Sequence, residues 1–468
     1  MIDRFWTVRR VAAALQGFGV RGSGFGGSAF PDDRPLARVW TDTRTIQPGD
    51  LFVALRGERF DAHDLLAEAV KAGAGALVVE DGSKAAGLGV PVLVVDNTLH
   101  ALGALGRYHR VAWSRPLVAV GGSNGKTTTK EMIRSALSAT LDVHATAANL
   151  NNQIGVPQTL LALPETADVA VIEVGTNQPG EIALLREMVQ ANIAVITTVQ
   201  EEHLEGFGNL AGVIAEEMSL CDGVGLAVVP FAEPAIVAEG MKRANGVVTV
   251  GVDGGDVRPD EYGQRATGNG FLRFGDVVVE VPLPGRHNLA NAVAAIAVAR
   301  AAGVSDADAA RGIANVKLPP MRSAVRPLGA ALLVNDAYNA NPASMRAALD
   351  MLASVGNGRP LIAVLGTMRE MGAATDSLHD DIARAALASD VAVIGAVGEF
   401  AAAFDRVSPN NTRIIKAPDS ESIWKELAPR LDPRAAILLK GSRGVRLERL
   451  VPHLEAWAGV AQRTGETS

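Results

Sequence analysis

Glycines, a lysine and a run of threonines follow an apolar segment near residue 120, a combination suited to polyphosphate chemistry. The segment 117–120 reads Leu-Val-Ala-Val, and the residues after it are Gly121, Gly122, Ser123, Asn124, Gly125, Lys126, Thr127 and Thr128. Glycines allow backbone N–H groups to surround phosphate oxygens, and a following helix directs its positive end at the same anion. Lys126 adds a point charge, and the Thr127 hydroxyl can ligate Mg²⁺. We interpret the segment as a phosphate-binding loop.

The loop is shorter than the full G-x-x-x-x-G-K-S/T pattern. Val120 stands where that pattern has its first glycine, so Gly122-x-x-Gly125-Lys126-Thr127 remains. A glycine-rich turn without a ligand is the alternative interpretation. The apolar strand, the loop, the Lys-Thr pair and the helix occur together, which favours nucleotide binding.

Acidic residues and a histidine follow two further apolar segments. Glu173 lies in the segment 169–174, near the carboxyl end of an expected central strand, where open α/β sheets bind their ligands. Its carboxylate suits Mg²⁺, and a buried, paired acid is the alternative. His203 follows the segment 193–199 among Glu201, Glu202 and Glu205. We expect it at the same sheet edge as Glu173, as a ligand or catalytic group, although a lone histidine is often structural.

Two polar loops are open to more than one interpretation. The loop 149–157 contains Asn149, Asn151 and Asn152, amides that build turns or orient a carboxylate or phosphate. The loop 440–444 contains Lys440 and Ser442, which suit a carboxylate or phosphate. A basic surface turn explains this second loop equally well.

The loop 335–342 combines a helix start with side chains that a helix start does not require. Asn341 is expected to cap a helix whose first residue is Pro342. Capping does not explain Asp336, Tyr338 and Asn339, in a chain with three tyrosines. These residue types suit a ribose hydroxyl and an adenine face.

The elements that must position these groups alternate between β-type runs and amphipathic helical segments, the pattern of parallel α/β sheets. We divide the chain into blocks 1–113, 114–319 and 320–468. The prediction is an α/β protein of three domains, with a small N-terminal α/β domain, a central doubly wound sheet carrying the phosphate loop, and a Rossmann-like C-terminal domain. A small antiparallel excursion is expected within 253–280, and residues 463–468 are expected to form a loose tail.

Composition excludes several classes of protein. A hydrophobic share of 48% with 20% charged residues fits a globular chain with a large core. The net charge of -7 makes nucleic acid an unexpected partner. The single Cys221 excludes an intramolecular disulfide, and no signal-like or bilayer-spanning apolar segment is found, so we expect a cytoplasmic protein without membrane insertion.

Together and in this order, the motifs resemble the Mur ligase family, most closely its branch that adds D-alanyl-D-alanine. The resemblance covers nearly the whole chain. Its most specific parts are Trp40 to Arg44, Pro48 to His63, Asn149 to Pro157, His203 to Gly208, Gly285 to Asn288, Asp336 to Pro342, Lys440 to Arg443 and the short phosphate loop.

The resemblance implies an ATP-dependent amide ligase of cell-wall precursor synthesis. Its substrates would be UDP-MurNAc-tripeptide and D-Ala-D-Ala, its intermediate an acyl phosphate, and its state a monomer. The first block would bind the UDP-linked substrate through Thr41, Asp42, Thr43 and Arg44, and the residues Asn149, Asn151, Asn152, Lys440 and Ser442 would also contact substrate. ATP would contact the phosphate loop, Asn288, Arg322, Asp336, Tyr338 and Asn339. Lys126, Glu173 and His203 would be catalytic.

The metal sites implied by the resemblance are two Mg²⁺ ions, one between Thr127 and Glu173 and one near His203. Fourteen residues after His203 the family has a lysine carbamylated by CO₂, and this chain has Glu217. We expect Glu217 to replace that anion. The chain also has Thr367 where the family has an acid, and Glu201 and Glu202 where it has small residues.

Two rival hypotheses remain at this point. One is another amide ligase of the same superfamily with a different amino-acid or peptide acceptor. The other is a non-catalytic nucleotide-binding relative, against which the joint presence of Lys126, Thr127, Glu173, His203 and Asp336 argues.

Overall fold

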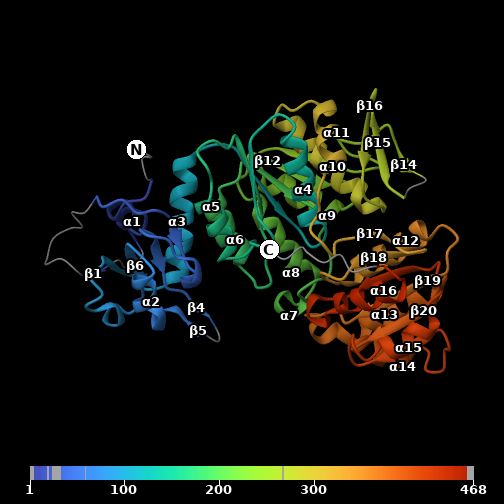
Figure 1. The fold of residues 1–468 in the computed structure, drawn as a ribbon. Helices are drawn as coiled ribbons and strands as arrows, with labels where there is room; N and C mark the ends of the chain where they lie inside the picture. Colours follow the sequence, from blue (N-terminus) through green and yellow to red (C-terminus); the bar gives the residue numbers. More distant parts are fainter. Residues whose placement is uncertain (1–4, 18–20, 24–32, 58–59, 266–267, 461–468) are drawn as a thin grey trace. The chain divides into compact units, whose positions relative to one another are not determined.

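The computed structural model describes residues 5–17, 21–23, 33–57, 60–265 and 268–460 (Figure 1). The expected tail at 463–468, and Glu58 and Arg59 of the first-block motif, lie outside these residues. The chain divides into two compact units. The first falls within 1–119, 142–175 and 181–192, and the second within 120–141, 176–180 and 193–468.

The N-terminal part of the first unit is a five-stranded sheet in the order β1-β7-β6-β3-β2, in which β1 is antiparallel to β7 and the other pairs are parallel. Its strands are β1 (Arg21–Ser23), β2 (Val39–Trp40), β3 (Leu51–Val53), β6 (Ala76–Val79) and β7 (Val92–Val94). The helices are α1 (Val8–Ala14), α2 (Leu66–Lys71) and α3 (Thr98–Trp113), and β4 (Arg56–Gly57) pairs antiparallel with β5 (Phe60–Asp61). The apolar faces of β3 and β6 are fully buried, as the unbroken Val/Leu/Ala runs predict.

The phosphate loop belongs to a six-stranded sheet in the order β13-β12-β11-β8-β10-β9. The strands are β8 (Leu117–Gly121), β9 (Val143–Ala145), β10 (Val169–Glu173), β11 (Ile193–Ile196), β12 (Leu226–Pro230) and β13 (Val247–Val250). The helices are α4 (Lys126–Leu137), α5 (Gly155–Leu161), α6 (Glu181–Val189), α7 (Leu204–Phe207), α8 (Leu210–Met218), α9 (Pro234–Arg243), α10 (Arg286–Ala301) and α11 (Asp306–Ala314). The almost continuously apolar α10 is buried against α4, because an all-round apolar helix needs cover on every side.

The expected antiparallel excursion is a three-stranded sheet of β14 (Glu261–Gln264), β15 (Gly270–Phe274) and β16 (Val277–Val281). Both strand pairs are antiparallel. Residues of β15 alternate between buried and half-buried, the period-2 pattern of a sheet with one covered face.

The C-terminal sheet has the order β17-β18-β22-β19-β20-β21. Its strands are β17 (Ala324–Leu328), β18 (Ala331–Asp336), β19 (Leu361–Gly366), β20 (Val391–Val397), β21 (Ile414–Ala417) and β22 (Ala436–Lys440), and β17 alone pairs antiparallel. Its helices are α12 (Pro342–Gly356), α13 (Thr375–Ala388), α14 (Glu399–Val407), α15 (Trp424–Leu427) and α16 (Leu450–Trp457).

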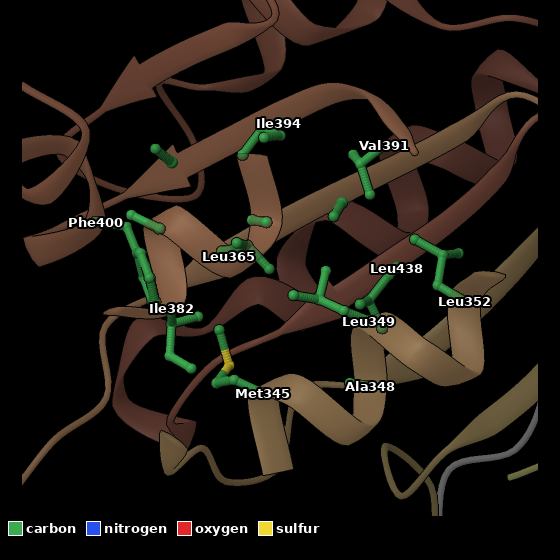
Figure 2. Packing of buried hydrophobic residues seen from close by; sticks show 14 of the residues in the cluster. Met345, Ala348, Leu349, Leu352, Leu365, Ile382, Val391, Ile394, Phe400 and Leu438 are labelled. Carbon is green, nitrogen blue, oxygen red and sulfur yellow. The ribbon is translucent and has the colours of Figure 1, made fainter. Parts of the chain in front are cut away.

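One core of this C-terminal part lies between the sheet and the helices α12, α13 and α14. Figure 2 shows Met345, Leu349 and Leu352 of α12 beside Leu365 and Leu438 of the sheet. Ile382 and Phe400 close the other end of the same cluster. The predicted mixed α/β fold with parallel sheets is therefore confirmed.

Candidate functional site

The phosphate loop turns sharply between β8 and α4. Gly122 and Gly125 have φ of 110° and 84°, a region that side chains with a Cβ rarely adopt. A Cβ on Gly122 would lie 2.5 Å from Thr197 Oγ1, and one on Gly125 would lie 2.9 Å from Asn291 Oδ1. Glycine is thus required twice, and α4 begins directly afterwards at Lys126. Sequence reasoning missed Asn291, because its role depends on how α10 packs here.

The loop is fastened to the segment after β11. Ser123 donates its backbone N–H to the Thr198 carbonyl at 2.6 Å, and the Ser123 hydroxyl accepts the Gln200 N–H at 2.9 Å. The strand β11 ends at Ile196, before the end of the expected segment 193–199, and Thr197 and Thr198 after it bond to Gly121 and Ser123. The residues after Ile196 bond to the loop as well as to the sheet.

Lys126 lies over its own loop. Its Nζ donates to the Gly122 carbonyl and, at 3.3 Å, to the Ser123 carbonyl. The buried Glu202 carboxylate lies 4.0 Å away. The cation therefore sits where the glycines turn, as the motif predicted.

Glu217 of α8 also contacts the loop. Its Oε2 accepts the Gly122 N–H at 2.7 Å, the side chain is buried, and Oε1 has no hydrogen-bond partner in the described part of the chain. Burial, against the opposing charge of Lys126 and with a smaller contribution from Glu202, raises the pKa of this carboxyl to about 7. The residue expected to replace the family's anion is thus in contact with the phosphate loop.

His203 adopts a left-handed backbone conformation, with φ of 48°, just before α7. Its Nδ1 bonds to the Glu370 carboxylate, and its Nε2 lies 4.0 Å from Glu202 Oε2. The Glu205 N–H donates to the Glu370 carbonyl at 3.3 Å. Glu370 was not among the predicted site residues.

Glu173 is the last residue of β10 and is buried. Its Oε1 accepts from Asn151 Nδ2 at 2.9 Å. Asn152 instead accepts the N–H groups of Ile154 and Gly155 at the start of α5. Both interpretations of the asparagine loop are realised: Asn151 orients a carboxylate, and Asn152 builds the turn. The Asn149 carbonyl accepts the Asn151 N–H within the same turn.

The predicted nucleoside residues gather at the ends of β18 and β22. Asp336 Oδ2 lies 2.8 Å from Lys440 Nζ, and Lys440 also donates to the Asn339 carbonyl at 2.7 Å. The Arg322 guanidinium lies 3.9 Å from the centre of the Tyr338 ring, a cation–π contact. Lys440, predicted to contact substrate, is therefore part of this group of residues.

Ser442 and Asn288 hold backbone segments in place. Ser442 accepts the Arg369 N–H at 3.0 Å, and its own N–H donates to the Thr367 carbonyl. Asn288 of α10 donates to the Pro284 carbonyl at 2.7 Å and accepts from Asn291 Nδ2 at 3.3 Å. The buried Asn288 thus orients the Asn291 side chain that packs on Gly125.

Asn341 caps α12 as predicted, with Pro342 at the first helical position. Its Oδ1 accepts the Ser344 N–H at 2.9 Å, and the Ser344 hydroxyl accepts the Asn341 N–H. Asn341 also bonds to Asn124 of the phosphate loop in both directions. Helix capping alone does not predict this second contact.

The loop Thr41 to Arg44 lies in the first unit and is held by short-range contacts. Asp42 accepts from the Arg44 N–H and guanidinium, and the Arg44 side-chain hydrogen bond lowers the pKa of Asp42. Thr43 begins a short 3₁₀ turn, and Thr41 Oγ1 accepts from Gln158 Nε2 at 2.8 Å. Arg44 is 85% exposed, so the loop presents a cation to solvent.

Comparison with known proteins shows which family the chain belongs to. Residues 35–110 match the Mur ligase family catalytic domain, 120–299 the Mur ligase middle domain and 321–443 the Mur ligase glutamate ligase domain. UDP-N-acetylmuramoyl-tripeptide--D-alanyl-D-alanine ligase of Escherichia coli strain K12 is 36% identical over 90% of this chain and 94% of that protein. The Bacillus subtilis ligase of that name is 33% identical over 89% and 92%. The chain belongs to the Mur ligase family.

Solved structures agree with this placement. A crystal structure of MurF from Acinetobacter baumannii superposes with a TM-score of 0.86 at 32% identity, covering 96% of this chain and 99% of that one. MurF ligase from Thermotoga maritima, solved in complex with ADP, has a TM-score of 0.80 at 27% identity and covers 90% and 98%. The chain is an ATP-dependent, amide-bond-forming Mur ligase. Within its described residues, no helix is both long and apolar enough to cross a membrane.

Three departures of this Mur ligase from the family pattern have defined contacts. The Thr367 hydroxyl accepts the Glu399 N–H at 3.0 Å at the start of α14. Glu202 is buried beside Lys126, while Glu217 accepts the Gly122 N–H. All three residues therefore stand next to backbone or charge that they can stabilise.

Proposed function

We propose that this Mur ligase joins D-alanyl-D-alanine to UDP-MurNAc-tripeptide, with conversion of ATP to ADP and phosphate. The observation that carries the proposal is the phosphate loop, in which two glycines turn the backbone and Lys126 stands over the turn. A loop of this form positions a polyphosphate for phosphoryl transfer. The relatives of matching length supply the identity of the two substrates.

The reaction begins when a carboxylate oxygen of the tripeptide attacks the γ-phosphorus of ATP. The bond from that phosphorus to the bridging oxygen breaks, ADP leaves, and an acyl phosphate forms. Lys126 and the N–H groups of the loop stabilise the negative charge on the transferring group. The amine of D-Ala-D-Ala then attacks the acyl carbon, loses a proton and expels phosphate, which gives the amide.

Two Mg²⁺ ions are part of the proposal. The buried Glu217 carboxylate fits a hard cation, because its Oε1 lacks a hydrogen-bond partner in the described structure. His203 and Glu217 would hold one ion, and Thr127 and Glu173 are also proposed as metal ligands. Bound Mg²⁺ would neutralise phosphate charge.

The three blocks take separate roles in this proposal. Residues 1–113 bind the UDP-linked substrate through Thr41 to Arg44, residues 114–319 bind the ATP phosphates, and residues 320–468 bind the nucleoside through Arg322, Asp336, Tyr338 and Asn339. Closure of the last block would exclude water from the acyl phosphate. We further propose a monomer that acts in the cytoplasm.

One assay tests the function. The protein is incubated with ATP, Mg²⁺, UDP-MurNAc-tripeptide and D-Ala-D-Ala, and ADP and the pentapeptide product are measured by mass spectrometry. We expect both products in equal amounts, and we expect D-alanine alone to be a poor acceptor. Product with a different acceptor only would support the rival amide ligase. Failure with every dipeptide would contradict the ligase proposal.

A bicarbonate titration tests the role of Glu217. If the Glu217 carboxylate replaces a carbamate, added bicarbonate leaves the rate unchanged. A rate that rises several-fold with bicarbonate, or full activity in Glu217→Ala, would contradict this role.

A further inference from the structure

Two asparagine side chains link the phosphate loop to the segment 336–342. Asn124 Nδ2 donates to Asn341 Oδ1 at 3.2 Å, and Asn341 Nδ2 donates to Asn124 Oδ1 at 3.1 Å. Asn341 is 1% exposed, and Asn124 is half-buried. Each carboxamide therefore uses both its oxygen and its nitrogen on the other one.

The orientation of this amide pair is defined by the helix that Asn341 caps. Asn341 Oδ1 also accepts the Ser344 N–H, so the oxygen and nitrogen of this side chain cannot be exchanged without loss of the cap. Its Nδ2 must then face Asn124. A carboxamide opposite offers a donor and an acceptor side by side, which serine, alanine or aspartate at the same position would not.

The two asparagines stand next to the groups that contact opposite ends of ATP in the proposed function. Asn124 directly precedes Gly125 and Lys126 of the phosphate loop. Asn341 ends the loop that carries Asp336 and Tyr338, and Asp336 is anchored by Lys440. The amide pair thus connects the part that binds phosphates with the part that binds the nucleoside.

A second contact links the sequence blocks 114–319 and 320–468, but its residues lie outside the phosphate loop and outside the segment 336–342. His203 bonds to Glu370, whose side chain is 48% exposed. A histidine–carboxylate hydrogen bond that solvent can reach holds its geometry weakly, because water competes for both groups. The two-way amide pair, in which Asn341 is buried, defines a distance and an orientation more narrowly.

We propose that Asn124 and Asn341 are positioning residues that hold the phosphate loop and the nucleoside segment at the separation that one ATP molecule spans. The inference rests on the proposed ATP site and deepens it. The amide pair should therefore raise the affinity for a ligand that contacts both segments. It should not change the affinity for a ligand that contacts the phosphate loop alone.

Calorimetric titration with the ATP analogue AMP-PNP and with inorganic tripolyphosphate tests this inference. The variants are Asn124→Ala, Asn341→Ser and the double variant, since serine keeps a helix cap at 341. We expect each single variant to weaken AMP-PNP binding about tenfold, and the double variant to lose no more than either one, because both remove the same two hydrogen bonds. Tripolyphosphate binding to Asn341→Ser should stay within about twofold of the wild type, because that variant leaves the phosphate loop unchanged.

Asn97→Ser is the matched control, since Asn97 caps α3 through the His100 N–H in the same way. It should leave both affinities unchanged, and thermal unfolding of each variant monitors the fold. A wild-type protein that binds AMP-PNP no more tightly than tripolyphosphate would overturn the proposed ATP site and this inference with it. Tight wild-type AMP-PNP binding combined with additive losses, or with equal losses for tripolyphosphate, would overturn the positioning role alone.

Discussion

The phosphate loop and the loop Thr41 to Arg44 differ in burial and in the partners that hold them. The first is largely buried and is held by partners far away in sequence, such as Glu217, 95 residues beyond Gly122. The second lies nearer to solvent, with Arg44 exposed and the other three residues half-buried, and is held mainly by neighbours, such as Arg44, two residues beyond Asp42. Buried charge requires partners wherever the fold can supply them, whereas an exposed loop keeps its shape from local bonds. The comparison predicts that substitutions act differently in the two places.

The largest effect is expected at Lys126. Lys126→Ala removes the cation that stands over the phosphate loop, and we expect the rate of ligation to fall by about 10³ or more, as for loss of a transition-state charge partner. The measurement is pentapeptide formation by mass spectrometry. Lys242→Ala is the control, because Lys242 is exposed and paired only within its own helix. Near-normal turnover in Lys126→Ala would contradict the role of the phosphate loop in phosphoryl transfer.

Asp336→Ala should cost stability as well as ATP binding. Lys440 is 4% exposed and would lose its carboxylate partner, and breaking a buried pair from one side costs about 3–5 kcal/mol. Urea unfolding monitored by circular dichroism measures the change. Asp432→Ala, which removes an exposed pair to Arg434, should stay within about 0.5 kcal/mol of the wild type. Equal effects of the two substitutions would contradict the distinction between buried and exposed charge.

Arg44→Ala tests the exposed loop. Because this guanidinium is largely in water, we expect the free energy of unfolding to stay close to that of the wild type. The KM for UDP-MurNAc-tripeptide should rise about tenfold with little change in kcat, as expected when a binding contact is lost equally in ground and transition states. Arg311→Ala, another exposed arginine, serves as control. A lower free energy of unfolding with unchanged KM would show that Arg44 stabilises the fold and does not bind substrate, which contradicts the prediction.

The smallest effect is a pH dependence at His379. Its Nε2 accepts the Met368 N–H at 2.9 Å and its Nδ1 donates to the Thr375 carbonyl at 2.7 Å, so the neutral ring holds the segment that carries Glu370. Burial lowers the pKa of His379 below 6.5, although the Thr375 carbonyl opposes this. The pKa of this histidine is about 6.5 in the unfolded chain and lower in the folded chain. At a pH between the two values the unfolded chain binds a proton that the folded chain does not, so the free energy of unfolding falls as pH drops below about 6.5.

His379→Gln sharpens this prediction because glutamine can accept the Met368 N–H and does not titrate. We expect the variant to lose less stability than the wild type between pH 6.5 and 5, measured as unfolding free energy in urea. Equal changes in unfolding free energy with pH for the two proteins would contradict a neutral His379 ring that accepts the Met368 N–H.

The sequence predicts what depends on local pattern. The strand expected at 169–174 forms as β10 because its apolar run is a local signal, and Asn341 caps α12 because Asn-Pro is a local helix start. The contact of Glu217 with Gly122 and that of Glu370 with His203 could not be predicted from sequence spacing. Their contacts span 95 and 167 residues and exist only once separate elements have packed. Gln158, which donates to Thr41, was missed for the same reason.

The central claim is that this Mur ligase makes UDP-MurNAc-pentapeptide with the phosphate loop as its phosphoryl-transfer site. Its most direct test is the positional isotope experiment with tripeptide whose terminal carboxylate carries ¹⁸O, followed by mass analysis of the released phosphate. We predict one ¹⁸O in the phosphate of the wild-type reaction, because the acyl phosphate passes a carboxylate oxygen to phosphorus, and neither ADP nor labelled phosphate with Lys126→Ala. Pentapeptide formed with unlabelled phosphate would contradict the account.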